Sequence, residues 1–214
     1  MASLRRVQHG TASNINILLR YNQVSMPIED LWNQIVRAKN ASDYVFKEIS
    51  VPKLTPSEAS KCRKLCEQNV CKCYGTNWAC PPGVGNLGDC MTQIRMYKHA
   101  AVIYHRSEVN MKDQDGLKRL SGILQNLLRD FRNLLKENGY PSMCLADGGC
   151  NYCGACAYPK ECKFPDQRVG SISAYGIMLM EYLEDNGIEF RFEDGYATFY
   201  GLVFYNEKDE IAVA

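Results

Sequence analysis

Four closely spaced cysteines constrain this chain more than any other feature of its sequence. Cys150, Cys153 and Cys156 follow one another at two-residue intervals, and five residues separate Cys162 from the last of them. Because each two-residue step turns the backbone, three thiols at this spacing can point toward one small object. The stretch therefore predicts a loop that wraps around a metal centre.

The donor set of this loop is typical of an iron–sulfur cluster. The bacterial ferredoxin run is C-x2-C-x2-C-x3-C-P. This stretch has two extra residues before Cys162, and Pro165 lies three residues after that cysteine. Four thiolates are the ligands of a [4Fe–4S] cluster, and Gly148, Gly149 and Gly154 would let backbone amides approach its sulfides. We predict such a cluster here, with zinc, and then disulfides or free thiols, as the alternatives.

Eleven cysteines is a large number for a chain of 214 residues. A secreted disulfide scaffold would be shorter, would usually carry an even number of cysteines and would begin with a signal peptide. Leu4-Arg5-Arg6 lies near the start of this chain, but no apolar run of signal-peptide length follows it. The cysteines therefore predict a cytoplasmic protein whose thiols are reduced and bind metal.

Charge and hydropathy exclude two classes of partner. The formal net charge is +1 at pH 7, and the sequence contains no block of like charges. We therefore expect neither nucleic acid nor a membrane surface as a partner. No apolar run approaches the length of a membrane span. The length allows one large domain or two small ones, with room for a substantial core.

A less regular group of cysteines lies earlier in the chain than Cys150–Cys162. Its members are Cys62, Cys66, Cys71, Cys73, Cys80 and Cys90. Their spacing fits no simple zinc knuckle, and Pro81-Pro82 fixes an extended backbone directly after Cys80. Tyr74 and Trp78 lie within this group, where they would either shield a cluster from water or simply fill core space. Residues 83–88 match the letters G-x-G-x-x-G, but Cys-Pro-Pro precedes them instead of a strand, so we reject a dinucleotide site.

Hydrophobic periodicity predicts both strands and helices in the chain. Strands are expected at residues 44–51, 99–104 and 143–146, followed by a C-terminal β-hairpin of residues 188–192 and 196–205. Helices are expected to begin at Pro27, at Thr55, near Cys90, at Asp113 or Asp115, and at Ser171. The positive end of the last helix would face an anionic cluster or a bound anion.

These elements predict a single α+β (or α/β) domain with a central mixed sheet, flanking amphipathic helices and two cysteine-rich cluster-binding loops. Residues 44–205 would form the cluster-binding domain, residues 1–43 an N-terminal extension with one helix, and residues 206–214 a C-terminal tail. The basic residues of the longest helix are expected on its solvated face. They are Lys118, Arg119, Arg129 and Arg132.

Two longer motifs resemble a known family. The first runs from Cys66 to Cys80-Pro-Pro, and the second runs from Gly149-Cys150 to Cys162-Lys-Phe-Pro and is followed by Ser-Ala-Tyr175-Gly-Ile. Together they resemble a family of cysteine-rich, predicted metal-binding proteins from anaerobic bacteria and archaea, over roughly residues 44–205. The resemblance implies metal binding and says little about a reaction.

The resemblance also implies which cysteines of the earlier, less regular group form a metal centre. In the family's pattern that centre is carried by the positions of Cys66, Cys71 and Cys80, with Cys90 as a plausible fourth ligand. Cys62, Cys73 and Cys144 look like additions in this chain, and whether they are ligands stays open.

Two clusters in one small domain would most simply conduct electrons. The expected partner is a redox protein, namely a ferredoxin, a flavoprotein or a catalytic subunit, and the oligomeric state stays open. One alternative is an enzyme in which a cluster site with three cysteines binds substrate. The sequence shows no separate catalytic arrangement, so the cofactor would have to supply that chemistry. The other alternative is a zinc-stabilised protein that serves in an assembly.

Overall fold

The computed structural model describes residues 26–191, 193–208 and 210. These residues form one α+β domain around a five-stranded mixed sheet, which confirms the predicted fold class. In their order across the sheet, the strands are β1 (Val45–Ile49), β2 (His99–Glu108), β5 (Tyr196–Tyr205), β3 (Ser142–Ala146) and β4 (Gly170–Ser171). Neighbouring strands are antiparallel except for β3 and β4, which run parallel.

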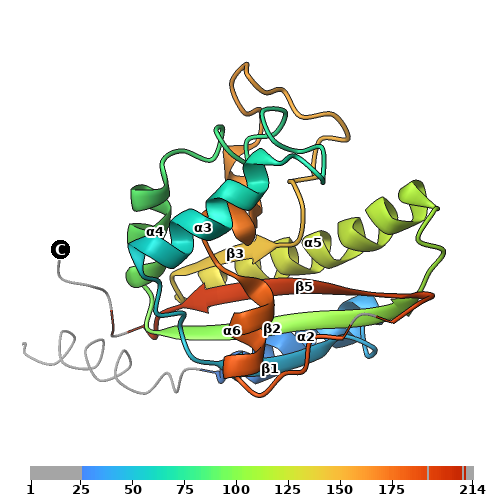
Figure 1. Ribbon diagram of the computed structural model, residues 1–214. Helices are drawn as coiled ribbons and strands as arrows, with labels where there is room; N and C mark the ends of the chain where they lie inside the picture. The colour runs from blue at the N-terminus through green and yellow to red at the C-terminus, as the bar shows by residue number, and fades with distance from the viewer. Residues whose placement is uncertain (1–25, 192, 209, 211–214) are drawn as a thin grey trace, which may run out of the picture.

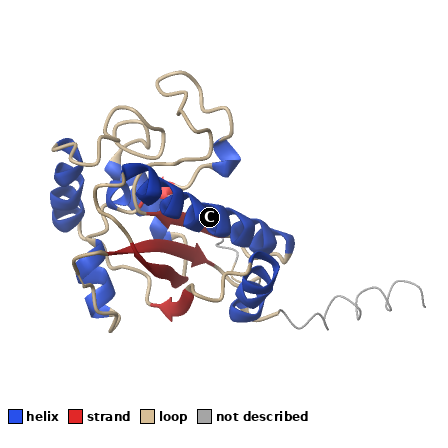
Figure 2. Ribbon diagram, turned by 90° about the vertical axis from the view of Figure 1, so that its right-hand side faces the viewer, coloured by secondary structure: helices blue, strands red, loops and turns tan. Residues whose placement is uncertain are grey.

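Helices flank this sheet on both faces (Figures 1 and 2). The described α-helices are α2 (Ile28–Lys39), α3 (Pro56–Glu67), α4 (Leu87–Arg95), α5 (Gln114–Glu137) and α6 (Leu179–Asp185). Two short 3₁₀ helices, η1 (Pro165–Gln167) and η2 (Ser173–Tyr175), connect the later elements. Among the described residues, none of the helices combines the length and the apolar character that crossing a membrane requires.

The sheet separates two hydrophobic cores. On one face, Phe131 of α5 and Trp32 of α2 pack in the same core as Val203 of β5. On the other face, Ile94 of α4 and Leu183 of α6 share a core with residues of β5 that include Leu202. Adjacent residues of β5 thus enter opposite cores, as the two-residue period of a strand requires.

Two helices begin at the cap residues that the sequence predicts. The hydroxyl of Thr55 accepts a hydrogen bond from the Glu58 N–H at 3.2 Å and donates to the Glu58 carboxylate at 2.6 Å, which caps the start of α3. The carboxylate of Asp113 accepts from the Gly116 N–H at 2.9 Å at the start of α5. These predictions are confirmed.

The helix predicted at Ser171 is absent, and this prediction was wrong. Ser171 instead pairs with Ala146 in the short parallel strand β4, and its N–H donates to the Ala79 carbonyl at 3.1 Å. Gly176 then adopts a φ of +81°, which interrupts helical geometry, and α6 begins only at Leu179. No helix N-terminus therefore faces the cysteine loops from Ser171.

The C-terminal hairpin and the N-terminal extension also differ in detail from the expectation. The turn before β5 forms where predicted, with the Tyr196 N–H donating to the Glu193 carbonyl at 3.1 Å. The described part of the segment before it, residues 188–191, is loop, and Phe190 stacks on Tyr200 of β5 at 5.5 Å. Helix α2 of the expected N-terminal extension packs into the main core, and residues 1–25 lie outside the described residues.

Candidate metal centre

The two cysteine loops lie side by side at one end of the domain. Figure 1 shows the loop after α3 and the loop after β3 together at the top of the molecule, and Figure 2 shows the same pairing from the side. All eleven cysteines are free thiols. The fold therefore brings together two stretches that are far apart in the sequence.

Three cysteines of the first loop surround a cavity of about 190 Å³. Cys66 lies in the last turn of α3, and Cys71 and Cys80 belong to the loop that follows. Tyr74 and Gly148 line the same cavity. The cavity is well above the roughly 30 Å³ that one water molecule occupies in the liquid.

Cys73 joins these three thiols. A hydrogen bond from the Cys80 thiol, a hydrogen bond from the Gly149 N–H and one from the Cys71 thiol lower the pKa of Cys73 to about 6, against the opposing effect of burial. The same bond to Cys73, together with burial, raises the pKa of Cys80. The Cys73 thiol therefore ionises more readily than the Cys80 thiol, and the thiolate is the form that binds metal.

Cys90 lies apart from this group. It is on α4, its side chain is only 1 % exposed, and it belongs to the hydrophobic core shared with α6. Burial raises the pKa of its thiol, and the charged side chains that also act on it are Arg63, Asp89 and Arg168. Cys90 thus lies in a hydrophobic core, whereas Cys73 interacts directly with Cys71 and Cys80.

The thiols of two further cysteines donate hydrogen bonds to backbone carbonyls. The buried Cys62 thiol donates to the Ile177 carbonyl at 3.3 Å, and the buried Cys144 thiol donates to the Leu128 carbonyl at 3.5 Å. Burial raises the pKa of both thiols to about 12. Both side chains therefore stabilise the fold as neutral thiols.

The second loop carries the four cysteines of the regular motif. Loss of surrounding water and the charges of Cys150, Cys162 and Cys156 all raise the pKa of the Cys153 thiol. Cys153 therefore interacts electrostatically with the three other cysteines of this loop. Gly154 within the loop has a φ of +68°, a conformation that favours glycine.

Asn77 joins the two loops. Its amide nitrogen donates to the Cys150 carbonyl at 2.9 Å, and its amide oxygen accepts from the N–H groups of Cys150 at 3.3 Å and Ala79 at 2.9 Å. Trp78 makes a second connection, since its indole N–H donates to the Lys160 carbonyl at 2.8 Å and its ring contacts Tyr158 at 5.1 Å. Trp78 therefore fixes one loop to the other.

Gly149 lies at the contact between the loops. A Cβ added there would lie 3.0 Å from the amide nitrogen of Asn77 and 3.2 Å from the Cys73 sulfur. Its N–H donates to the Cys73 sulfur, and its carbonyl accepts from the Gln125 amide at 3.0 Å. The glycine thus lets the backbone approach the Cys73 sulfur of the first loop. The predicted approach of its amide to a cluster held by its own loop stays a prediction.

Two polar side chains of α5, Gln125 and Arg129, contact the second loop. Arg129 and Gln125 are 3 % and 1 % exposed, and a guanidinium nitrogen of Arg129 lies 3.6 Å from the Cys150 sulfur. Arg129 also donates to the Gln167 carbonyl at 2.8 Å and to the Gln125 side chain at 3.1 Å. The expectation that Arg129 is solvated was therefore wrong, because its partners are carbonyls and a thiol that the sequence does not place nearby.

Whether Cys73 is a ligand stays open from the sequence, and Asn77, Gln125 and Arg129 were not predicted to lie beside the cysteine loops. The i, i+4 spacing of Gln125 and Arg129 does place both on one helix face, within a stripe that is otherwise apolar. Among the described residues, no three His, Cys, Asp or Glu side chains meet in an arrangement that would hold a single metal ion.

An α+β domain with thiols concentrated on two adjoining loops has the donor chemistry of a metal-binding protein. The chain belongs to a family of predicted metal-binding proteins (DUF2284), whose family model matches residues 49–205. This match confirms the family that the two cysteine motifs predict. A comparison with the curated proteins and a comparison with the solved structures each gave no match.

Proposed function

We propose that the two cysteine loops hold two [4Fe–4S] clusters and that the protein transfers electrons to or within a redox enzyme system. Cys150, Cys153, Cys156 and Cys162 would hold one cluster. Cys66, Cys71 and Cys80 would hold the other, with Cys73 as the fourth ligand in place of Cys90. When bound, the clusters would supply reversible one-electron chemistry.

The donor set fits such clusters. Every candidate ligand is a thiol, and thiolates are the ligands of iron–sulfur clusters of this type. The roughly 190 Å³ cavity lined by Cys66, Cys71 and Cys80 has room for more than one metal ion. A single zinc ion would instead draw its four sulfurs to about 2.3 Å from one point.

The observation that carries the proposal is the contact between the two loops. Asn77 bonds directly to the backbone of Cys150 from a position three residues before Cys80. The two groups of thiols are therefore neighbours, because Asn77 joins the loops that carry them. Electron tunnelling weakens steeply with distance, so adjacent centres favour passage of an electron between them.

Two groups of the protein would tune these centres. The Arg129 guanidinium beside Cys150 and the Gly149 N–H at Cys73 place positive charge next to sulfur. Hydrogen bonds and positive charge at the sulfurs favour the more negative, reduced state, so both contacts would raise the reduction potential. Both contacts come from the protein itself, so their effect on the reduction potential does not depend on the partner.

A partner would meet the second loop at two exposed aromatic side chains. Tyr152 and Phe164 are 44 % and 46 % exposed and contact each other at 5.1 Å on this loop. Exposed apolar groups beside a redox centre are suited to a transient protein contact. We propose a ferredoxin, a flavoprotein or a catalytic subunit as that partner, acting in the cytoplasm, where thiols stay reduced.

A redox titration followed by electron paramagnetic resonance tests this function. Protein purified without oxygen is reduced stepwise with a low-potential donor and then reoxidised. We expect reversible signals that broaden when both centres are reduced, because neighbouring paramagnets couple. Protein that takes up no electrons, or that bleaches irreversibly, would exclude electron transfer.

A second candidate function is an iron–sulfur enzyme with an open ligand position. It is favoured by the cavity itself, since Cys66, Cys71 and Cys80 line it together with Ser171 and Ser173, whereas Cys73 is not among its lining residues. Addition of small ligands such as sulfide or cyanide to the oxidised protein distinguishes the two. A spectral change that is larger in Cys73→Ser than in the wild-type protein would favour the enzyme.

A further inference from the structure

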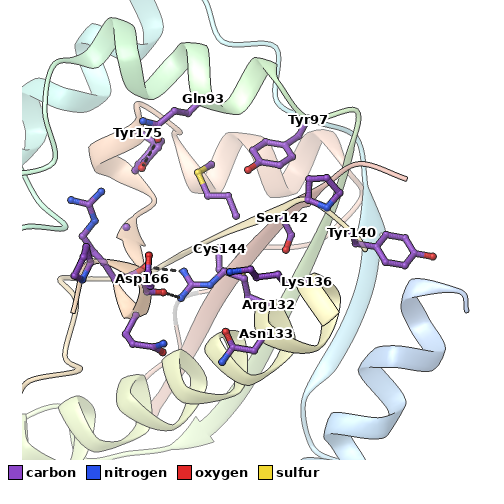
Figure 3. A pocket seen from close by; sticks show the side chains of 16 residues that line it. Gln93, Tyr97, Arg132, Asn133, Lys136, Tyr140, Ser142, Cys144, Asp166 and Tyr175 are labelled. Atoms are coloured by element: carbon purple, nitrogen blue, oxygen red, sulfur yellow. Dashed lines mark hydrogen bonds between the residues drawn. The ribbon is translucent and has the colours of Figure 1, made fainter. Parts of the chain in front are cut away.

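A larger cavity lies beside η1, where the second cysteine loop ends. It has a volume of about 700 Å³ and lies between α4, the C-terminal half of α5, the start of β3 and η1. This volume is within the range of about 300–1,000 Å³ that is typical of small-molecule sites. Figure 3 shows the side chains that converge on it.

One wall of the cavity is cationic. Arg132 and Lys136 come from successive turns of α5, and Arg168 follows η1, whereas Asp166 is the acidic residue of the lining. The Arg132 guanidinium donates to the backbone carbonyls of Asp166 and, at 2.9 Å, of Arg168, which holds it in place at the cavity wall. The excess of positive charge favours an anion.

The facing wall is aromatic and neutral. In Figure 3, Gln93, Tyr97 and Tyr175 reach the cavity from the side opposite Arg132 and Lys136. Burial raises the pKa of both tyrosines, so both keep their hydroxyl protons at neutral pH. The Tyr175 hydroxyl donates to the Gln93 side chain at 3.0 Å, which leaves the amide nitrogen of Gln93 as a donor.

The floor of the cavity is a strand edge with an unsatisfied hydroxyl. β4 pairs with β3 only at Leu145 and Ala146, so the preceding residues of β3 have no strand neighbour on this side within the described sheet. The Ser142 hydroxyl is buried there and has no hydrogen-bond partner among the described residues. A buried polar atom without a partner costs stability, and an acceptor on a ligand would satisfy it.

We propose that this cavity binds a small organic anion. A phosphate or carboxylate group would lie against Arg132 and Lys136, and the apolar body would lie on Tyr97, with the Ser142 hydroxyl donating to the ligand. A planar guanidinium matches both kinds of anionic group. This inference is independent of the metal centre, since no candidate metal ligand of either loop lines the cavity.

Calorimetric titration of the full-length protein tests the proposal with four probes. They are phenyl phosphate, benzoate, benzyl alcohol and inorganic phosphate, each used at millimolar concentration. We expect phenyl phosphate or benzoate to bind, with the tighter of the two identifying the anionic group, and we expect binding to weaken as salt is added. Benzyl alcohol, which lacks the charge, should bind at least about tenfold more weakly.

A charge-reversal variant locates the site, and a matched variant controls for net charge. Lys136→Glu should weaken binding of the aryl anion at least about tenfold, because it places a like charge beside the ligand. Lys118→Glu changes the net charge equally on the same helix, but Lys118 is not a lining residue, so we expect less than about a twofold effect. Both lysines are exposed, so neither variant threatens folding.

Three results would overturn the proposal. The first is absence of binding by both aryl anions. The second is an equal loss in Lys136→Glu and Lys118→Glu, which would indicate a response to net charge. The third is inorganic phosphate binding as tightly as phenyl phosphate, which would leave the aromatic wall without a role.

Discussion

Replacement of Asn77 by alanine should release the second cysteine loop from the first. The side chain makes three hydrogen bonds, at 2.9, 3.3 and 2.9 Å, and two of them hold the carbonyl and the N–H of Cys150. Each such bond contributes about 0.5–1.5 kcal/mol to stability, and this site is partly open to water, so we expect a loss of about 2 kcal/mol. That loss corresponds to an increase of about 30-fold in the equilibrium constant for local opening.

Amide hydrogen exchange of residues 147–157 measures this opening. The comparison uses chelator-treated wild-type and Asn77→Ala protein, so that metal–thiolate bonds do not hold the loop. We expect exchange in this segment to become about 30-fold faster, while the amides of β2 and β5 keep their protection because the core is unaffected.

Asn110→Ala is the matched control. The Asn110 side chain accepts a single local hydrogen bond, from the Lys112 N–H at 3.0 Å, in an exposed turn away from both loops. It should leave residues 147–157 unchanged. An acceleration of less than about twofold in Asn77→Ala, or an equal one in Asn110→Ala, would refute the reasoning that Asn77 joins the loops.

Three further changes give defined outcomes. Cys73→Ser should remove a large part of the bound metal, whereas Cys90→Ser should keep the metal and lower only the urea midpoint; equal metal contents would contradict this assignment. Gly149→Ala would place its Cβ 3.2 Å from the Cys73 sulfur, and we expect a cost of about 1–3 kcal/mol in urea unfolding. Burial raises the pKa of Asp147 to about 7 although its carboxylate accepts from the Tyr200 N–H. Because the unfolded chain loses this proton near pH 4, stability should fall as the pH rises from about 4 to about 7, and Asp147→Asn should flatten that fall in unfolding curves measured across this range.

Features that depend on neighbouring residues in the sequence were predictable. The capping residues Thr55 and Asp113 begin their helices as expected, since a cap acts within one turn. The alternating aromatic residues of 196–205 placed β5 correctly, because successive side chains of a strand face opposite sides of the sheet. That Cys150, Cys153 and Cys156 point toward one metal centre stays a prediction from their spacing.

Features that depend on tertiary contacts were not predictable. Cys73 enters the first group because Gly149, from a loop much later in the chain, donates to its sulfur. The buried position of Arg129 depends on carbonyl and thiol partners more than twenty residues away. At Ser171, pairing with β3 replaced the local tendency to begin a helix.

Metal and sulfide analysis tests the central claim most directly. The claim is that the two loops hold iron–sulfur clusters on eight thiols, with Cys73 among them. Protein purified without oxygen should contain about eight iron atoms and about eight acid-labile sulfides per chain. One or two zinc ions per chain with no sulfide would contradict the account.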